Sequence, residues 1–142
     1  IRDQEMSRGS EMCIRDRREP ARFCNLRDRT HAVLSGNPDL AAEAWHDGYV
    51  VHAPADRFEA NAFGLHHVFG NVWEWCLDDY GRYTDPARDG DGFRVTPSGL
   101  GAMIRGGSWG ERAADCRVSR RESVRPRSAS EAIGLRPARR LD

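Results

Sequence analysis

The sequence contains no lysine: all 22 of its basic residues are arginine, and 22 aspartates and glutamates balance them. A net charge of zero gives no overall field to attract nucleic acid or a membrane surface, so neither is an expected partner. Long apolar runs are also missing, since no stretch approaches the roughly 20 apolar residues of a membrane-spanning helix. No cleavable signal pattern opens the chain. The all-arginine bias is typical of a GC-rich, bacterial genome, and the compartment, cytoplasmic or exported, stays open.

Cysteine is scarce and irregularly spaced. The four cysteines stand at positions 13, 24, 76 and 116, with no Cys-x-x-Cys pair, which argues against a zinc or thioredoxin-type site. Disulfides are neither required nor excluded by this spacing. A length of 142 residues fits one domain with a modest core. The 14 glycines and seven prolines favour a loop-rich fold over long helices.

The first 17 residues differ from the rest of the chain. Ile1-Arg2-Asp3 recurs as Ile14-Arg15-Asp16 within a polar, charged stretch. This stretch has no apolar period of 2 or 3.6, so it is not expected to pack on a core. We interpret residues 1–17 as a tail or an artefact, and residues 18–142 as the domain.

The domain is expected to consist of short elements. Pro38 to Ala44 is predicted as two helical turns with Asn37 as the cap. Phe63 to Trp75 is predicted as strand, turn and strand, bent at two glycines, and Thr84 to Gly101 as a long exposed loop. Further strands are expected at Met103–Arg105 and Cys116–Arg120. The tryptophans at positions 73, 75 and 109 are predicted to form one buried cluster, because aromatic side chains dominate small cores.

Three sequence blocks stand out in a fixed order. They are Asn61 to Trp75, which ends in Gly-Asn-Val-Trp-Glu-Trp, then Arg105-Gly-Gly-Ser-Trp109, then Ile133-Gly-Leu-Arg-Pro137. Together they resemble the sulfatase-modifying-factor, or formylglycine-generating-enzyme, family. The resemblance implies an α+β, C-type-lectin-like fold with little regular secondary structure. It covers the C-terminal part of the family domain, so we expect an N-terminally truncated domain that belongs to a larger protein.

The resemblance also implies a chemistry. The enzyme that names the family oxidises a sulfatase cysteine to formylglycine with oxygen and copper(I), a soft ion that prefers two thiolates. Cys116, eight residues after Ser108, matches the second cysteine of the family pair, but Glu111 stands at the first position. Trp73 and Ser108 match residues that line the oxygen pocket. Their alternative roles are core packing for Trp73 and a turn hydrogen bond for Ser108.

Two calcium sites follow from the same resemblance. In the first, Asn25 and Asp47 would supply side-chain oxygens, and Leu26 and Tyr49 backbone carbonyls. The alternative is an Asn cap and an Asp-Gly turn.

In the second site, Glu74 would supply its carboxylate, and Gly70 and Val72 their carbonyls. The fourth position is His67, a nitrogen donor poorly suited to calcium. The alternative is that Glu74 pairs with a buried arginine, Arg105 or Arg136. A third acidic group, Asp85, Asp89 and Asp91, is interpreted as a solvated loop because it lacks the spacing of an EF-hand.

The sequence therefore supports three hypotheses about function. The first is a sulfatase-modifying-factor domain without the copper-dependent oxidase activity, since Glu111 replaces one cysteine of the pair. The second is an active formylglycine-generating oxidase with a sulfatase-type protein or peptide as substrate. The third is a lectin-like binding or display module. The fold suits all three, so the decision rests on the site.

Overall fold

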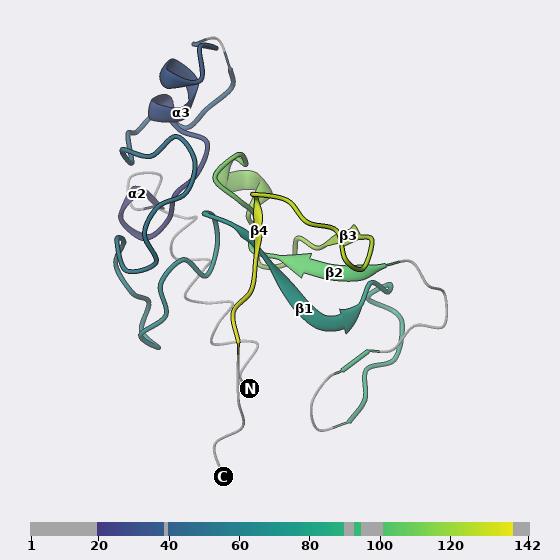
Figure 1. Cartoon of the computed structure of the whole chain (residues 1–142). Coiled ribbons are helices and arrows are strands. Elements are labelled where there is room, and N and C mark those ends of the chain that lie inside the picture. Colours follow the sequence, from purple (N-terminus) through teal and green to yellow (C-terminus); the bar gives the residue numbers. More distant parts are fainter. Residues whose placement is uncertain (1–19, 39, 90–92, 95–100, 138–142) are drawn as a thin grey trace.

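The computed structural model describes residues 20–38, 40–89, 93–94 and 101–137. These residues form few regular elements, arranged as a small sheet beside a loop-rich N-terminal region (Figure 1). The helices are α2 (Pro20–Phe23) and α3 (Arg29–Leu34), with a 3-10 turn at Ala113–Asp115. The strands are β1 (Trp73–Asp79), β2 (Ala102–Arg105), β3 (Glu122–Val124) and β4 (Ile133–Gly134). The predicted tail at 1–17 lies outside the described residues.

The sheet has the strand order β3-β2-β1-β4. Strands β1 and β2 pair antiparallel, with Glu74 opposite Arg105, and β4 joins β1 in parallel, with Ile133 opposite Trp73. The predicted strand at Met103–Arg105 is confirmed within β2. The predicted strand at Cys116–Arg120 is wrong, because the chain there leaves a 3-10 turn and bends before β3 begins at Glu122. The sheet thus brings the Trp-Glu-Trp block beside the last block of the sequence.

The N-terminal region contains a helix in a different place from the one predicted. The helix spans Arg29–Leu34 and begins at Asp28, whose side chain accepts a hydrogen bond from the backbone N–H of His31. The predicted helix at Pro38–Ala44 is wrong, because Glu43 lies extended and forms a bridge to Asp28. An acidic side chain that caps the first turn outweighs the proline signal some residues later.

A tight turn joins the N-terminal region to the sheet. Gly70 has a positive φ of 73°, and a Cβ there would clash with the backbone carbonyl of Asn25. Only glycine fits this approach without strain. Residues 63–72 consist of turns and bends, so the first strand predicted between Phe63 and Trp75 is absent from this part of the structure, while the second begins at Trp73.

The core is small and lies where the two regions meet. Its central cluster consists of Cys24, Leu26, Phe69 and Cys116. Trp73 is also buried, but Trp75 and Trp109 are only half-buried. The Trp109 ring packs against two histidine rings, His31 at 5.3 Å and His52 at 6.4 Å between centroids. The predicted cluster of three buried tryptophans is therefore wrong: Trp109 joins loops rather than the sheet.

The segment after β1 is a surface loop as far as the structure describes it. Residues 84–89 form neither helix nor strand, and all but Asp85 are exposed. Asp85 accepts a hydrogen bond from the backbone N–H of Arg82 at 2.6 Å, as a turn residue does. Asp91 and residues 95–100 of the predicted loop lie outside the described residues. No helix among the described residues has the length and apolar character needed to cross a membrane.

Candidate functional site

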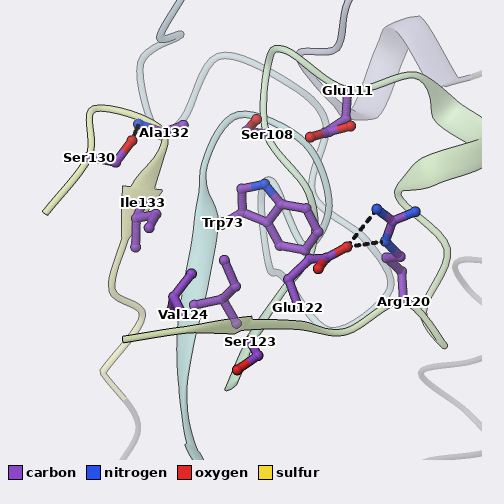
Figure 2. Close-up of a pocket in the computed structure, with 11 residues that line it drawn as sticks. Trp73, Ser108, Glu111, Arg120, Glu122, Ser123, Val124, Ser130, Ala132 and Ile133 are labelled. Carbon is purple, nitrogen blue, oxygen red and sulfur yellow. Dashed lines mark hydrogen bonds and ion pairs between the residues drawn. The ribbon is translucent and has the colours of Figure 1, made fainter. Parts of the chain in front are cut away.

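An open cavity of about 350 Å³ lies between the sheet and the loop that follows β2 (Figure 2). Two predicted site residues, Trp73 and Ser108, line it together with Glu111. The remaining lining comes from β2, β3, β4 and their flanking turns: Ile104, Arg120, Glu122, Ser123, Val124, Ser130, Ala132 and Ile133. The three sequence blocks therefore converge on one cavity, although 60 residues separate Trp73 from Ile133.

Cys116 does not line this cavity. It is 2% exposed and belongs to the apolar cluster of Cys24, Leu26 and Phe69. Its Sγ packs directly behind Gly107, where a Cβ would clash with the sulfur, and Gly107 has a positive φ of 78°. Burial, together with the negative charges of Glu111 and Asp115, raises the pKa of the Cys116 thiol to about 12. The side chain is thus held as a neutral thiol inside the core.

These residues do not fit a copper(I) ion. Copper(I) prefers two thiolate ligands, and Cys116 is buried and does not reach the cavity. The position of the second cysteine holds Glu111, a hard oxygen donor. Cys76 lies on β1, where its Sγ is 3.9 Å from the backbone carbonyl of Glu74, and neither Cys76 nor Cys24 lines the cavity. No pair of described cysteines is therefore presented to the cavity.

The first predicted calcium site is brought together by two N-terminal loops. The Asp47 carboxylate accepts hydrogen bonds from the backbone N–H of Leu26 at 3.1 Å and of Tyr49 at 2.8 Å. Burial raises the pKa of Asp47 to about 6, although both hydrogen bonds act in the opposite direction. No cationic side chain among the described residues pairs with this carboxylate. A half-buried acid without a partner cation is thus present at this site.

The neighbouring oxygen atoms fit a hard cation. Asn25 is fully buried, and its Oδ1 is one of the buried side-chain atoms that have no hydrogen-bond partner. The carbonyls of Leu26 and Tyr49 accept no backbone hydrogen bond within the described residues. Buried polar atoms normally find a partner, and calcium takes carboxylate, amide and carbonyl oxygens together. The four predicted ligands are therefore compatible with a calcium ion.

Two residues that the sequence reasoning missed hold this site in place. Asp28 is fully buried, caps α3, and accepts a hydrogen bond from the backbone N–H of Asp47. Asn71 exchanges two hydrogen bonds with the backbone of Ala53 and accepts a third, at 3.1 Å, from the Asn25 side chain. The sequence features that could have identified them are an Asp just before a helix, for Asp28, and the Gly-Asn pair, for Asn71.

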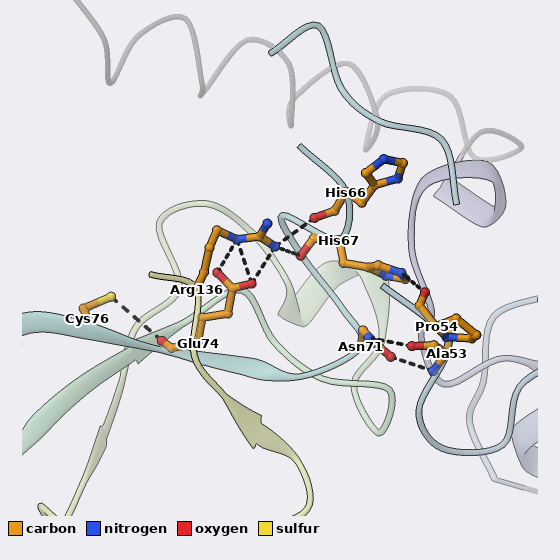
Figure 3. Close-up of polar contacts among 8 residues, drawn as sticks. All are labelled: Ala53, Pro54, His66, His67, Asn71, Glu74, Cys76 and Arg136. Carbon is orange, nitrogen blue, oxygen red and sulfur yellow. Dashed lines mark hydrogen bonds and ion pairs between the residues drawn. The ribbon is translucent and has the colours of Figure 1, made fainter. Parts of the chain in front are cut away.

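The second predicted calcium site has a cation of its own. Arg136 donates to both carboxylate oxygens of Glu74, the shortest distance being 2.6 Å, and also to the backbone carbonyls of His66 and His67 (Figure 3). The predicted Glu74–Arg136 pair is thereby confirmed, whereas Arg105 donates to the carbonyl of Val118.

The fourth position of that site is also occupied by other contacts. The His67 ring hydrogen-bonds through Nε2 to the carbonyl of Pro54 at 3.0 Å and packs against Phe58, and burial lowers its pKa. A calcium ion held by Glu74, with carbonyls from Gly70 and Val72, would lie beside the Arg136 guanidinium and be repelled by it. This second set of residues does not fit calcium.

Comparisons with known proteins agree with this architecture. The family model described as the sulfatase-modifying factor enzyme 1-like domain matches residues 26–141. The formylglycine-generating enzyme of Thermomonospora curvata is 32% identical over 137 residues, which cover 92% of this chain and 41% of that protein. The formylglycine-generating enzyme of Streptomyces coelicolor is 35% identical over 103 residues, which cover 68% of this chain and 32% of that protein.

A solved structure confirms the predicted fold. The structure of PvdO from Pseudomonas aeruginosa aligns with a TM-score of 0.62 and 28% identity, over 81% of this chain and 38% of that one. The chain thus spans less than half the length of each of these similar proteins. The family model matches well over half of the chain, and its blocks meet at one cavity. The chain therefore belongs to the sulfatase-modifying-factor family and has the family's α+β, formylglycine-generating-enzyme-like fold.

Proposed function

We propose that this domain is a binding member of its family, without the copper-dependent cysteine oxidase activity. The observation that carries the proposal is the position of Cys116, which lies in the core behind Gly107, while Glu111 and not a second cysteine stands at the other family position. A bis-thiolate copper site needs two ionisable sulfurs at a surface that substrate reaches. Among the described residues, no pair of cysteines lines the cavity.

The cavity itself supports a binding role. Trp73 is 7% exposed and Ser108 4% exposed, so both are fixed by the fold rather than mobile on the surface. The Ser108 hydroxyl accepts a hydrogen bond from the backbone N–H of Gly110, which orients it at the edge of the cavity. An aromatic wall with a few placed polar groups is the usual composition of a ligand site. The family's sulfatase-type substrates make a protein or peptide the partner that we propose.

We further propose that a calcium ion stabilises the N-terminal loops. Asn25 and Asp47 would hold it through side-chain oxygens, and Leu26 and Tyr49 through carbonyls. The buried, unpartnered Oδ1 of Asn25 and the raised pKa of Asp47 support this assignment. The ion would supply positive charge and close the segment between residues 26 and 47, which offsets the entropy of ordering that loop. Its role would be structural.

The oxidase hypothesis is tested with a peptide that carries a sulfatase-type cysteine motif. The purified chain is supplied with copper(I) and oxygen, and mass spectrometry follows the conversion of cysteine to formylglycine. We expect no product, whereas the Thermomonospora curvata enzyme serves as the positive control. Product that disappears in a Cys116→Ala variant would establish the active-oxidase alternative and overturn the proposal.

A further inference from the structure

The cavity is surrounded by more negative than positive charge. Arg120 is the one cationic side chain among its lining residues, and it pairs with Glu122 at 2.6 Å and with Asp115 at 3.5 Å. Glu111 lines the same cavity, whereas Asp115 does not. The lining residues thus carry two carboxylates, Glu111 and Glu122, and one guanidinium, which leaves an excess of one negative charge. Unpaired charge at a partly desolvated site favours binding of a cation.

Unlike Glu122 and Asp115, which pair with Arg120, Glu111 has no hydrogen bond or ion pair through its carboxylate within the described residues. Its backbone is fixed at both ends, because its N–H donates to the carbonyl of Ser108 and its carbonyl accepts from the N–H of Arg27. Arg120, the nearby guanidinium, is paired with Glu122 and Asp115 instead. Figure 2 shows the carboxylate and Ser108 at the same end of the cavity, above the Trp73 ring. A charged acceptor and a hydroxyl therefore share one rim.

The floor of the cavity is apolar and aromatic. The Trp73 indole forms its central wall, and Ile133, Val124 and Ala132 lie around it (Figure 2). The face of an indole attracts a cation, and the effect increases as water is excluded. The aliphatic side chains suit a short hydrocarbon stem. The surface thus combines a site for positive charge with a site for methylene groups.

Other ligand classes fit this surface less well. An anion would meet Glu111 and Glu122, and the guanidinium of Arg120 is already engaged by two carboxylates. Within the described residues, no group of three or more His, Cys, Asp or Glu side chains is placed to hold a metal ion. A neutral ligand would leave the Glu111 charge without a counterion.

We propose that the cavity binds the ammonium group of a primary alkylamine, such as the side chain of a lysine in a partner peptide. Glu111 accepts from the ammonium, Trp73 packs against its stem, and Ser108 offers a further acceptor. This inference deepens the proposed binding role and rests on it. The inference depends on Glu111, which occupies the position of a cysteine in the family's pair. It therefore applies to this chain and not to the family as a whole.

The test is a titration of the isotopically labelled full chain, followed by NMR. The probe is n-butylammonium, with n-butanol and butyrate as the neutral and anionic controls of the same length. We expect n-butylammonium alone to shift the Trp73 indole N–H signal saturably. Glu111→Gln should weaken binding at least tenfold, and Glu111→Asp, which keeps the charge, should retain most of it. Glu59→Gln is the matched control, because Glu59 pairs with Arg22 on the surface and lies outside the cavity.

Each result decides the inference. Equal shifts with n-butanol, no saturable shift, or unchanged affinity in Glu111→Gln with a native spectrum would overturn it. If Glu111→Gln unfolds, Glu111→Asp together with the two control ligands still separates charge recognition from apolar contact. Formylglycine product in the peptide assay would refute the loss of oxidase activity by a different readout, so the failure of one proposal is distinguishable from the failure of the other.

Discussion

Two regions of this molecule match metal sites of the family, and they differ in what remains of the donor set. In the N-terminal loops, the Asp47 carboxylate accepts from the backbone of Leu26 and Tyr49, and the buried amide oxygen of Asn25 has no hydrogen-bond partner. At the cavity, one of two predicted copper ligands is a glutamate, and the other, Cys116, is buried behind backbone. The first region offers oxygen atoms of the kind that calcium prefers. The second presents no pair of described cysteines to the cavity.

The difference shows that a scaffold and its chemistry are separable. Trp73 and Ser108 still shape a cavity, because their positions depend on strand pairing and a loop turn rather than on copper. Asp47, by contrast, is a half-buried acid whose pKa is raised chiefly by burial and also by the nearby charge of Asp28. Motif residues that are present therefore indicate the fold. A buried polar atom without a hydrogen-bond partner, such as Asn25 Oδ1, indicates where a ligand would bind.

The largest predicted effect concerns the wall of the cavity. Trp73→Ala should lower the free energy of unfolding by about 3–5 kcal/mol, because it removes a large buried aromatic side chain. Urea unfolding followed by circular dichroism measures this loss. The half-buried Trp75 serves as the control, and Trp75→Ala should cost less. A Trp73→Ala protein as stable as the wild type would mean that the cavity wall is not part of the scaffold.

A second prediction separates Glu74 from Asp47. Glu74→Ala should destabilise the fold by about 2–3 kcal/mol, because it leaves Arg136 without its carboxylate in a half-buried position. The loss should be the same with calcium and with a chelator. Glu59→Ala, which breaks an exposed pair with Arg22, should cost less than about 1 kcal/mol. A calcium-dependent loss in Glu74→Ala would place an ion at the site that we judge unfit.

The third prediction concerns the calcium ion in the N-terminal loops. A ligand that binds only the folded state raises stability, by about 2.7 kcal/mol at a hundred times its dissociation constant. Differential scanning calorimetry should show a higher melting temperature in calcium than in chelator. Asp47→Ala should abolish the increase, since it removes the formal charge among the four predicted ligands. Equal increases in both proteins would show that the ion binds elsewhere.

A smaller effect should appear in the pH dependence of the calcium-free protein. The pKa of Asp47 rises from 3.8 to about 6 on folding, chiefly through burial, so the folded state holds this proton more tightly than the unfolded state. Its contribution to stability is complete below about pH 4 and is lost as the pH rises to about 6. Asp47→Asn should therefore flatten the fall in melting temperature over this range. The same slope in wild type and variant would reject a raised pKa.

The sequence blocks predicted which residues would come together better than they predicted the local elements. Trp73 and Ser108 line one cavity as expected, because motif order reflects strand pairing in a shared fold. The Glu74–Arg136 pair was predicted as one of two alternatives, since a half-buried acid needs a cation. In contrast, the helix was assigned to Pro38–Ala44 instead of Arg29–Leu34, because a proline signal was given more weight than the Asp28 cap.

The sequence patterns did not predict how deeply a side chain is buried or which side chains pair at the cavity. Spacing placed Cys116 at a ligand position, but only the structure shows it packed behind Gly107, outside the cavity. Arg120 and Glu122 pair at 2.6 Å and both line the cavity, although no motif in the sequence indicates this. These features depend on how loops fold over the sheet, and no periodicity in the sequence encodes that arrangement.

The central claim is that the cavity no longer holds copper(I), and a competition titration tests it most directly. The reduced chain is titrated with copper(I) against a chromophoric chelator, in parallel with a Glu111→Cys variant and a Cys116→Ser control. Wild type and Cys116→Ser should compete equally weakly, because Cys116 is buried outside the cavity and Glu111 stands where a second thiol would be needed. Tight binding of one copper(I) by the wild type, lost in Cys116→Ser, would contradict the account.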